Sequence, residues 1–294
     1  MLIGDLNGGG RMNEIKRLFE AITPFKALQI TKIGGMTNTN YLVKSDANHY
    51  VLRIPPKNAQ AIINREQEKH IEKALMESGI SAKCLYFDSK TGIKITEFIN
   101  AKTLNFTDME KHFNALANKL KALHTSKLDF KYHFNPADEM KKYLEFARNS
   151  RFWFDELKKG LEPFYHHLEK VKNINQKYFN TEFVFTSTHG DLVPQNILVS
   201  DEDIRLIDWE YAGLNDPCWD LASFIIECEL SLELENEFLL AYGADEIKRQ
   251  KIKYYKNLVD ILWAVWAVAK SDENTNYIDY AKTRLNAALN RDEI

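Results

Sequence analysis

HGDLVPQN at residues 189–196 and IRLIDWE at residues 204–210 are the most informative parts of this sequence. Between them, the apolar run Ile197–Val199 and the apolar start of the second stretch lie on either side of a polar turn at residues 200–203. Apolar runs joined by a short polar turn are typical of a tight β-hairpin. The sequence therefore predicts a small sheet with polar residues gathered near one of its ends.

Three of these polar residues have the chemistry that phosphoryl transfer from a nucleotide requires. Asp191 can orient a substrate hydroxyl and accept its proton, and oxygens of Asn196 and Asp208 can hold Mg²⁺ beside the phosphates. An HxDxxxxN pattern alone often arises by chance, but an Asp at the end of the next apolar strand makes chance a poor explanation. We interpret His189 as a buried orienting residue, and Glu210 either as a helper of the metal site or as a salt-bridge partner.

Composition narrows the class of protein. The chain has 294 residues, is 45% hydrophobic and 28% charged, and carries a formal net charge of -3. This charge gives no reason to expect nucleic acid or an anionic membrane as a partner. The longest apolar stretch, Leu258–Ala269, contains Asp260 and is shorter than the roughly 20 residues that span a bilayer. No signal peptide is visible, and three scattered cysteines indicate neither a disulfide framework nor a zinc site. We expect a cytoplasmic protein with a small-molecule substrate.

The order of the predicted elements indicates an α+β fold with two lobes. We expect a flexible leader at residues 1–13, an N-lobe at residues 14–98 that binds nucleotide, and a catalytic and substrate-binding C-lobe at residues 99–294. After a short helix at Asn13–Ala21, the N-lobe has an antiparallel sheet and one main helix, predicted as strands Ala27–Ile33, Thr39–Lys44 and His49–Ile54, helix Asn58–Glu77, and strands Lys83–Phe87 and Ile93–Phe98. The larger C-lobe is mostly helical, with helices predicted at Asp108–His124, Pro136–Asn149, Leu161–Tyr178, Leu221–Tyr242, Asp245–Lys270 and Asn276–Leu289.

Two features of the N-lobe fit a phosphate-binding role. GGMTNTNY at residues 34–41 joins the first two strands, and its backbone N–H groups near Gly35, with the side chains of Thr37 and Asn38, can cover phosphates. Paired glycines are common in hairpins, so this loop alone is weak evidence. Arg53 is a basic residue among apolar neighbours in the third strand, and it must face an anion because an unpaired buried charge is costly.

The C-lobe motifs resemble those of the aminoglycoside-phosphotransferase and choline-kinase superfamily, and most closely those of bacterial choline kinases. The resemblance rests on HGDLVPQN (189–196), IDWEYAG (207–213) and DPCWDLA (216–222), and the loop at residues 34–41 is also similar to that of bacterial choline kinases. It implies a protein-kinase-like fold that binds ATP, in which Asp191 is the catalytic base and Asn196 and Asp208 bind Mg²⁺.

The resemblance also implies roles for residues of the N-lobe. Arg53 stands where most kinases have Lys, as it does in choline kinases, and a guanidinium can still hold phosphate with two donors. Its ion-pair partner is then Glu68 rather than Glu66, because the Arg-x-x-Glu spacing of the family falls on Arg65 and Glu68. Backbone groups from Glu97 to Ile99 are expected to hydrogen-bond the adenine ring.

The acceptor substrate depends on aromatic residues near the C-terminus. Trp263 and Trp266 share one face of a predicted helix, where such a pair is usually part of the core. A quaternary ammonium, however, binds in an aromatic cage for which indole is the best wall, and choline kinases have a similar Trp-x-x-Trp pair. Glu210, Tyr211 and Trp219 are further candidates for this site. Aminoglycoside kinases need clustered carboxylates instead, whereas the acidic residues at 227–237 are spread around a predicted helix and are expected to be solvated.

Together, these patterns predict ATP- and Mg²⁺-dependent phosphorylation of choline to phosphocholine. One alternative is a kinase of the same fold that acts on ethanolamine, an amino sugar, an aminoglycoside or another small alcohol. Another is a nucleotide-binding pseudokinase that acts through partners, which the presence of Asp191, Asn196 and Asp208 disfavours.

Overall fold

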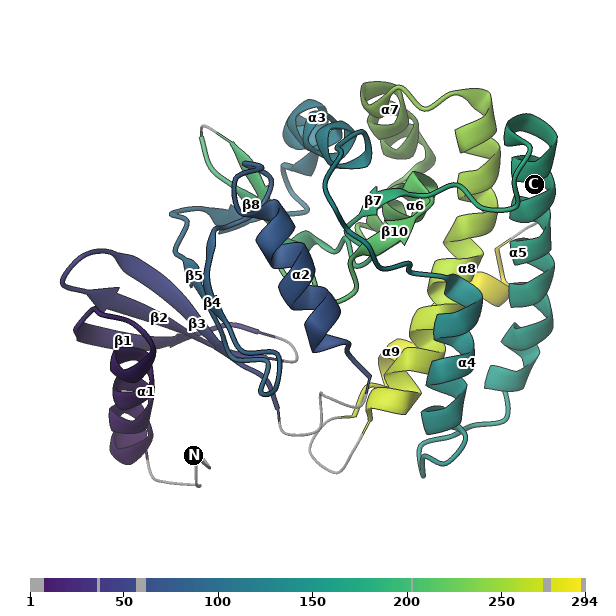
Figure 1. Cartoon of the computed structure of the whole chain (residues 1–294). Coiled ribbons are helices and arrows are strands. Elements are labelled where there is room, and N and C mark those ends of the chain that lie inside the picture. Colours follow the sequence, from purple (N-terminus) through teal and green to yellow (C-terminus); the bar gives the residue numbers. More distant parts are fainter. Residues whose placement is uncertain (1–7, 36–37, 57–61, 202, 272–275, 292–294) are drawn as a thin grey trace. The chain divides into compact units, whose positions relative to one another are not determined.

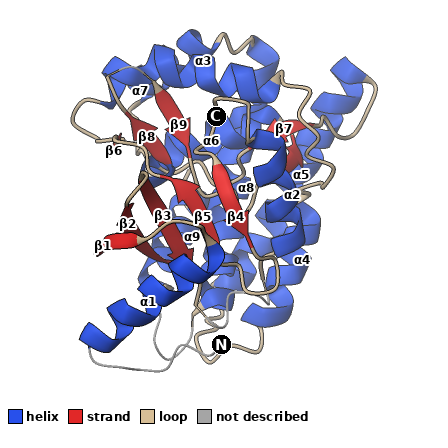
Figure 2. Cartoon of the chain, turned by 60° about the vertical axis from the view of Figure 1, so that its left-hand side comes forward, coloured by secondary structure: helices blue, strands red, loops and turns tan. Residues whose placement is uncertain are grey.

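The computed structural model describes residues 8–35, 38–56, 62–201, 203–271 and 276–291. Contacts divide the chain into two compact units, Met1–Ala101 (unit 1) and Lys102–Ile294 (unit 2). Among the described residues, the longer strands belong to unit 1, whereas unit 2 has short strands and most of the helices (strands red and helices blue in Figure 2). No helix in the described residues is long and apolar enough to cross a membrane.

Unit 1 is built on a five-stranded antiparallel sheet with the strand order β1-β2-β3-β5-β4. The strands are β1 (Ala27–Ile33), β2 (Thr39–Ser45), β3 (His49–Ile54), β4 (Cys84–Phe87) and β5 (Lys94–Glu97). Their bounds agree with the sequence prediction to within a residue. The strands are short runs rich in β-branched and aromatic residues, and β1 and β3 end just before Gly34 and Pro55, while β2 and β4 end just before Asp46 and Asp88. The sheet places Arg53 directly opposite Lys94 on the neighbouring strand.

Two helices accompany this sheet. Helix α1 (Gly8–Ile22) buries Ile15 and Phe19 against strand residues, and it begins at Gly8, within the expected leader and before the predicted start at Asn13. Helix α2 (Arg65–Leu75) packs near β4. The prediction that this helix already covers residues 62–64 is wrong, because Asn64 is extended and caps it by accepting the N–H of Gln67.

Unit 2 is organised around the long helix α8. Its residues Leu258–Val268 are buried without interruption, and all are apolar except Asp260, which pairs with Arg284 and Arg291. Four helices pack against it, namely α4 (Pro136–Ala147), α5 (Leu157–Phe179), α6 (Pro217–Glu227) and α9 (Ile278–Leu289), while α3 (Phe113–His124) packs against α7 (Leu232–Tyr242) (Figure 1). Helix α8 itself spans Glu246–Lys270, with Asp245 as its N-cap.

Short strands complete unit 2. The predicted hairpin is confirmed as β8 (Ile197–Val199) paired with β9 (Ile204–Leu206), and β6 (Lys102–Thr103) pairs with β8. A second small sheet, which the sequence patterns do not reveal, pairs β7 (Thr186–Thr188) with β10 (Gly213–Asn215). Single-turn 3₁₀ helices lie at Met109–His112 and Pro194–Asn196.

One predicted helix is wrong. The single helix expected at Leu221–Tyr242 is two helices, α6 and α7. Glu229 has a left-handed backbone with φ of 48°, and Ser231 starts α7 by accepting the N–H of Leu234. The acidic residues near this break therefore do not lie around one continuous helix. The α+β class, with an antiparallel sheet followed by a mostly helical unit, is confirmed.

Candidate active site

The loop at His189–Asp191 has a backbone that requires glycine at its centre. Gly190 has a φ of +83°, and a Cβ there would lie 2.2 Å from the carbonyl oxygen of Tyr211. On either side, the buried His189 ring accepts the Asp191 N–H at Nδ1 (3.3 Å), and its Nε2 lies 2.9 Å from the carbonyl oxygen of Ile207. His189 thus orients the loop through both ring nitrogens, in line with the sequence interpretation.

Side chains of helix α6 hold the backbone of this loop by hydrogen bonds. The two carboxylate oxygens of Asp220 accept the N–H groups of His189 and Gly190 at 2.8 and 2.9 Å, and the indole N–H of Trp219 donates to the Gly190 carbonyl at 2.9 Å. His124 of α3 contacts the same Asp220 carboxylate at 3.0 Å. These hydrogen bonds from the first turn of α6 leave the loop backbone little freedom.

The structure brings the three predicted catalytic and metal-binding residues to one end of the β8–β9 hairpin. Asn196 Nδ2 donates to the backbone oxygen and to Oδ2 of Asp191, at 2.9 and 3.3 Å. The Ile207 N–H donates to the Asn196 carbonyl at 2.9 Å. Asp208, the next residue, therefore lies at the same end of the hairpin as Asn196. Asp208 has a left-handed φ of 67°, which is uncommon outside glycine and frequent at functional sites.

The electrostatics of this group favour a bound cation. Burial and then the carboxylates of Glu227, Asp208 and Glu210 hold the pKa of Asp191 well above its usual value. Because Asn196 turns its Nδ2 toward Asp191, its Oδ1 faces away, and no hydrogen bond from a described residue occupies that oxygen. The amide oxygen of Asn196 and the carboxylate of Asp208 are ligands that suit Mg²⁺, and the surrounding carboxylates make the electrostatic potential of the site negative.

In unit 1, Arg53 faces a buried carboxylate. Its Nη1 lies 2.6 Å from Oε1 of Glu68, while Glu66 is exposed. Arg65 holds the other oxygen of Glu68 at 2.6 Å, and Lys94 lies 3.3 Å from Oε1. Burial opposes ionisation of Glu68, but Arg53, Lys94 and Arg65 outweigh it and lower its pKa from 4.5 to about 2. Glu68 is therefore the ion-pair partner of Arg53, as the sequence analysis predicts.

The loop predicted to cover phosphates is closely folded where it is described. A Cβ on Gly35 would lie 2.2 Å from the carbonyl oxygen of Asn38, so a side chain does not fit there. Asn38 is buried, and Asn40 Nδ2 donates to the Gly34 carbonyl at 3.0 Å. Thr37 lies outside the described residues.

The segment predicted to bind adenine follows β5. The side chain and N–H of Glu97 are both hydrogen-bonded to the backbone of Lys83. The backbone N–H of Ile99, by contrast, donates to none of the described residues. A backbone donor without an internal partner is suited to a ligand acceptor such as an adenine ring nitrogen.

Aromatic side chains from three segments form a cluster in unit 2. Trp263 and Trp266 meet edge to face at 5.6 Å, and the Tyr211 ring lies 5.1 Å from Trp263, also edge to face. Tyr277, which sequence reasoning missed, lies 5.7 Å from Trp266. The sequence analysis placed Tyr277 within the last predicted helix, Asn276–Leu289, and no sequence pattern linked it to the two tryptophans.

Trp219, grouped with this site from the sequence, does not join the cluster. It is fully buried, packs against Phe134 and Tyr255, and uses its indole N–H to hold Gly190. The prediction of Trp219 as a cage residue is therefore corrected to a loop anchor. Glu210 is buried beside Tyr211 and, after burial itself, is the largest cause that raises the pKa of Tyr211.

The expectation that the acidic residues at 227–237 are solvated fails for Glu227. Its carboxylate is nearly buried, lies 2.7 Å from Nη2 of Arg284, and accepts the Tyr280 hydroxyl at 3.1 Å. Burial raises its pKa despite Arg284. Glu227 is also the largest charged contributor to the raised pKa of Asp191, so it belongs to the electrostatic surroundings of the site.

The choline/ethanolamine kinase family matches residues 29–251, which include the loop at His189–Asp191 and the β8–β9 hairpin. The chain belongs to this family. Protein LicA of Haemophilus influenzae is 30% identical to this kinase over 277 residues, covering 90% of this chain and 79% of that protein. The probable ethanolamine kinase of Arabidopsis thaliana is 28% identical and covers 86% of this chain and 76% of its own.

Solved structures agree with this membership. The crystal structure of choline kinase LicA from Streptococcus pneumoniae superposes with a TM-score of 0.84 at 30% identity, covering 95% of this chain and 98% of that chain. A macrolide 2'-phosphotransferase superposes with a TM-score of 0.68 at 18% identity and shows the fold alone. This choline/ethanolamine kinase family member is therefore a small-molecule kinase with a protein-kinase-like fold, as the sequence predicts.

Proposed function

We propose that this kinase transfers the γ-phosphoryl group of ATP to the hydroxyl of choline and releases phosphocholine. The observation that carries the proposal is the position of Tyr211. Its ring belongs to the aromatic cluster with Trp263 and Trp266, while its backbone lies against Gly190, the neighbour of Asp191. A cation held by these rings would therefore have its hydroxyl end close to the proposed base. The similarity to the choline kinase LicA named above supports choline as the acceptor, and a LicA structure in complex with AMP supports an adenine nucleotide as the donor.

The polar groups of the cluster favour a quaternary over a primary ammonium. Trp266 donates its indole N–H to the Tyr211 hydroxyl, and the buried Trp263 N–H has no acceptor among the described residues. Beside their π faces, these rings leave the Trp263 N–H as a donor unused by the described residues, while the Tyr211 oxygen already accepts the Trp266 N–H. A trimethylammonium group has no N–H to satisfy and binds well to π faces, whereas a primary ammonium brings three N–H donors that need acceptors. The cluster is better suited to choline than to ethanolamine.

Asp191 is proposed to act as the general base. It would accept the proton of the choline hydroxyl while that oxygen bonds to the γ-phosphorus and the bond to ADP breaks. The raised pKa of Asp191 makes it a better proton acceptor than an ordinary Asp. The Asp220 and Trp219 hydrogen bonds hold the loop, so that the carboxylate is already oriented before substrate binds.

The remaining site residues are proposed to bind ATP and its metal. Asn196 and Asp208 would hold Mg²⁺, which when bound offsets the negative charge of the phosphates. In unit 1, Arg53 and the loop around Gly35 and Asn38 would bind phosphate, with Glu68 orienting Arg53. The free N–H of Ile99 would hydrogen-bond the adenine.

Steady-state kinetics with graded acceptors test this proposal. ADP release is measured with ethanolamine, its mono- and dimethyl forms, choline and an aminoglycoside, each with Mg²⁺ and with EDTA. We expect kcat/KM to rise with each methyl group and activity to disappear in EDTA. A higher kcat/KM for ethanolamine would make the protein an ethanolamine kinase, and transfer to no acceptor, with ATP still bound, would indicate a pseudokinase.

A further inference from the structure

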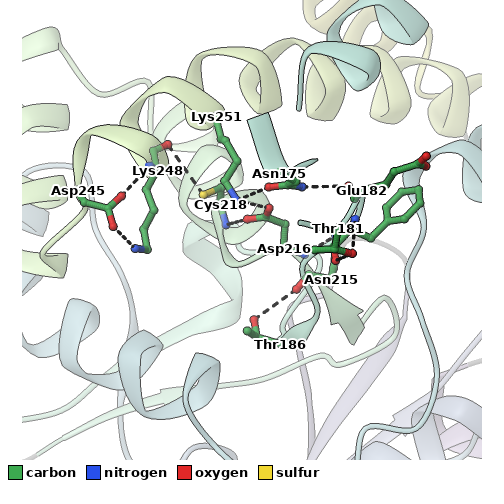
Figure 3. A network of polar contacts seen from close by, with 11 residues as sticks. Asn175, Thr181, Glu182, Thr186, Asn215, Asp216, Cys218, Asp245, Lys248 and Lys251 are labelled. Atoms are coloured by element: carbon green, nitrogen blue, oxygen red, sulfur yellow. Dashed lines mark hydrogen bonds and ion pairs between the residues drawn. The ribbon is translucent and has the colours of Figure 1, made fainter. Parts of the chain in front are cut away.

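Lys251 is a buried cation that the proposed chemistry does not use. It lies on α8 with only 2% of its surface exposed, and its Nζ contacts Asp216 Oδ2 at 2.5 Å and Asn175 Oδ1 at 3.1 Å (Figure 3). The ring of Phe179, 5.3 Å away, covers the ammonium. An ammonium is costly to bury unless its partners are well placed, so this lysine fixes the positions of both oxygens that it contacts.

The contact of Lys251 with Asp216 connects the ammonium to helix α6. Asp216 is the N-cap of α6, and its Oδ1 accepts the Cys218 N–H at 3.0 Å while Oδ2 holds Lys251. The first turn of α6, directly after this cap, carries Trp219 and Asp220, which hold the backbone of Gly190. A shift of the cap would therefore move the groups that anchor the catalytic loop.

The contact of Lys251 with Asn175 connects the ammonium to the segment before β7, the strand that precedes the same loop. Asn175 Nδ2 donates to the Glu182 carbonyl at 3.1 Å, just before β7 (Figure 3). Strand β7 runs into His189, and at its far end Thr186 pairs with Asn215 of β10 and donates its hydroxyl to the Asn215 carbonyl at 3.3 Å. Strand β10 in turn leads into Asp216. The chain entering the loop and the helix anchoring it are thus tied to one ammonium.

We propose that Lys251 is a positioning residue for the catalytic loop, acting through Asp216 and Asn175 rather than through contact with substrate. Because α8 also carries Trp263 and Trp266, the same lysine fixes the acceptor-binding helix relative to the loop that carries Asp191. This inference rests on the proposed function, since Asp191 must be the group whose position limits turnover. Loss of Lys251 then lowers kcat more than it changes the KM for ATP.

Lys251→Met tests the inference, with Lys248→Met as the matched control. Lys248 lies one turn earlier on α8, and its side chain pairs with the exposed Asp245 at 2.7 Å, while only its backbone carbonyl faces Cys218 Sγ at 3.9 Å (Figure 3). The same change there removes a charge and keeps the carbonyl that contacts the buried network. We expect Lys251→Met to lower kcat at saturating choline roughly tenfold or more, because small displacements of reacting groups are costly. Lys248→Met should keep kcat and both KM values within about twofold of the unchanged protein.

A second variant separates positioning from folding. Lys251→Met leaves the Asp216 charge buried and alone, so Lys251→Met/Asp216→Asn removes both charges while Asn still caps α6. We expect the double variant to regain the thermal midpoint but not kcat, and hydrogen exchange at Gly190 to stay faster than in the unchanged protein. Recovery of kcat together with the midpoint, or a single variant with full kcat, would overturn the inference.

Two further results keep the test decisive. If neither Lys251 variant folds, Asn175→Ala is used instead, because it removes only the connection from Lys251 to the Glu182 carbonyl. A lowered kcat with an unchanged thermal midpoint would then support the inference, and an unchanged kcat would overturn it. If the unchanged protein and Lys248→Met transfer phosphoryl to none of the acceptors, the proposed function fails, and the inference falls with it. If the unchanged protein and Lys248→Met are active and Lys251→Met has a normal kcat, the inference is wrong while the proposed function stands.

Discussion

The indole N–H of Trp266 donates a 2.7 Å hydrogen bond to the phenol oxygen of Tyr211. This bond joins α8 to the segment that follows Asp208, and the Tyr211 backbone lies against Gly190. Burial and the Glu210 carboxylate hold the pKa of Tyr211 well above its usual value, so the phenol stays protonated at neutral pH. Tyr211 thereby connects the aromatic cluster with the loop at His189–Asp191, the proposed catalytic loop.

Tyr211→Phe should weaken both stability and choline binding. The change leaves the buried Trp266 N–H without an acceptor, which costs about 1–3 kcal/mol in the free energy of unfolding. We expect a higher KM for choline and an unchanged KM for ATP, measured by steady-state kinetics alongside urea denaturation. Tyr165→Phe, at an exposed tyrosine, is the control and should change neither quantity. An equal rise in both KM values would contradict the assignment.

Trp263→Ala should reduce the preference for a charged acceptor. Cation–π attraction contributes about 0.5–2 kcal/mol, so choline should lose binding while its neutral carbon isostere, 3,3-dimethylbutan-1-ol, is affected much less. The measurement is the ratio of kcat/KM for the two alcohols in both proteins. If Trp263 is only core packing, the ratio stays constant and the protein simply loses stability.

Asp191→Asn should remove turnover and spare nucleotide binding. Loss of a general base lowers kcat by about 10²–10⁴-fold, and Asn keeps the size of the side chain. Single-turnover assays report the chemical step, and calorimetry reports the affinity for ATP. Asp201→Asn, in the exposed turn of the β8–β9 hairpin, is the matched control. Near-normal turnover in Asp191→Asn would exclude Asp191 as the base.

Glu68→Gln should change how stability depends on pH. Because the folded pKa of Glu68 is lowered from 4.5 to about 2, its ionised form stabilises the fold above about pH 4.5, and this contribution is lost as pH falls toward 2. The variant should lose about 3–5 kcal/mol at pH 7, since three cations lose their common partner. Denaturation at several pH values measures the difference, which should shrink below pH 4.5. A constant difference across this range would contradict the account.

Local sequence patterns predicted much of the fold. The strands of unit 1 and the β8–β9 hairpin are recognisable because runs of β-branched residues end at turn-forming residues. Strands β7 and β10, each three residues long, are too short for a periodic pattern and depend on their pairing with each other. The break between α6 and α7 depends on one left-handed residue, Glu229, in a sequence that otherwise favours helix.

The grouping of the candidate site residues could be predicted where chemistry constrains the residue type. Asp191, Asn196 and Asp208 are recognisable because few residues can serve as base or metal ligand at that spacing. Trp219 could not be separated from Trp263 by sequence, since both are tryptophans in apolar helices. The structure distinguishes them by the hydrogen bond of Trp219 to Gly190 and by their different aromatic neighbours. Glu227 was missed because its burial arises from Arg284 on a distant helix.

The most direct test of the central claim is a competition between two acceptors. The protein is given equal concentrations of choline and ethanolamine with limiting ATP and Mg²⁺, and ³¹P NMR measures both phosphorylated products. We expect phosphocholine to dominate in the unchanged protein, and Trp263→Ala to bring the two products closer to equal amounts. Phosphoethanolamine as the main product, or no phosphorylated product while ATP still binds, would contradict the claim.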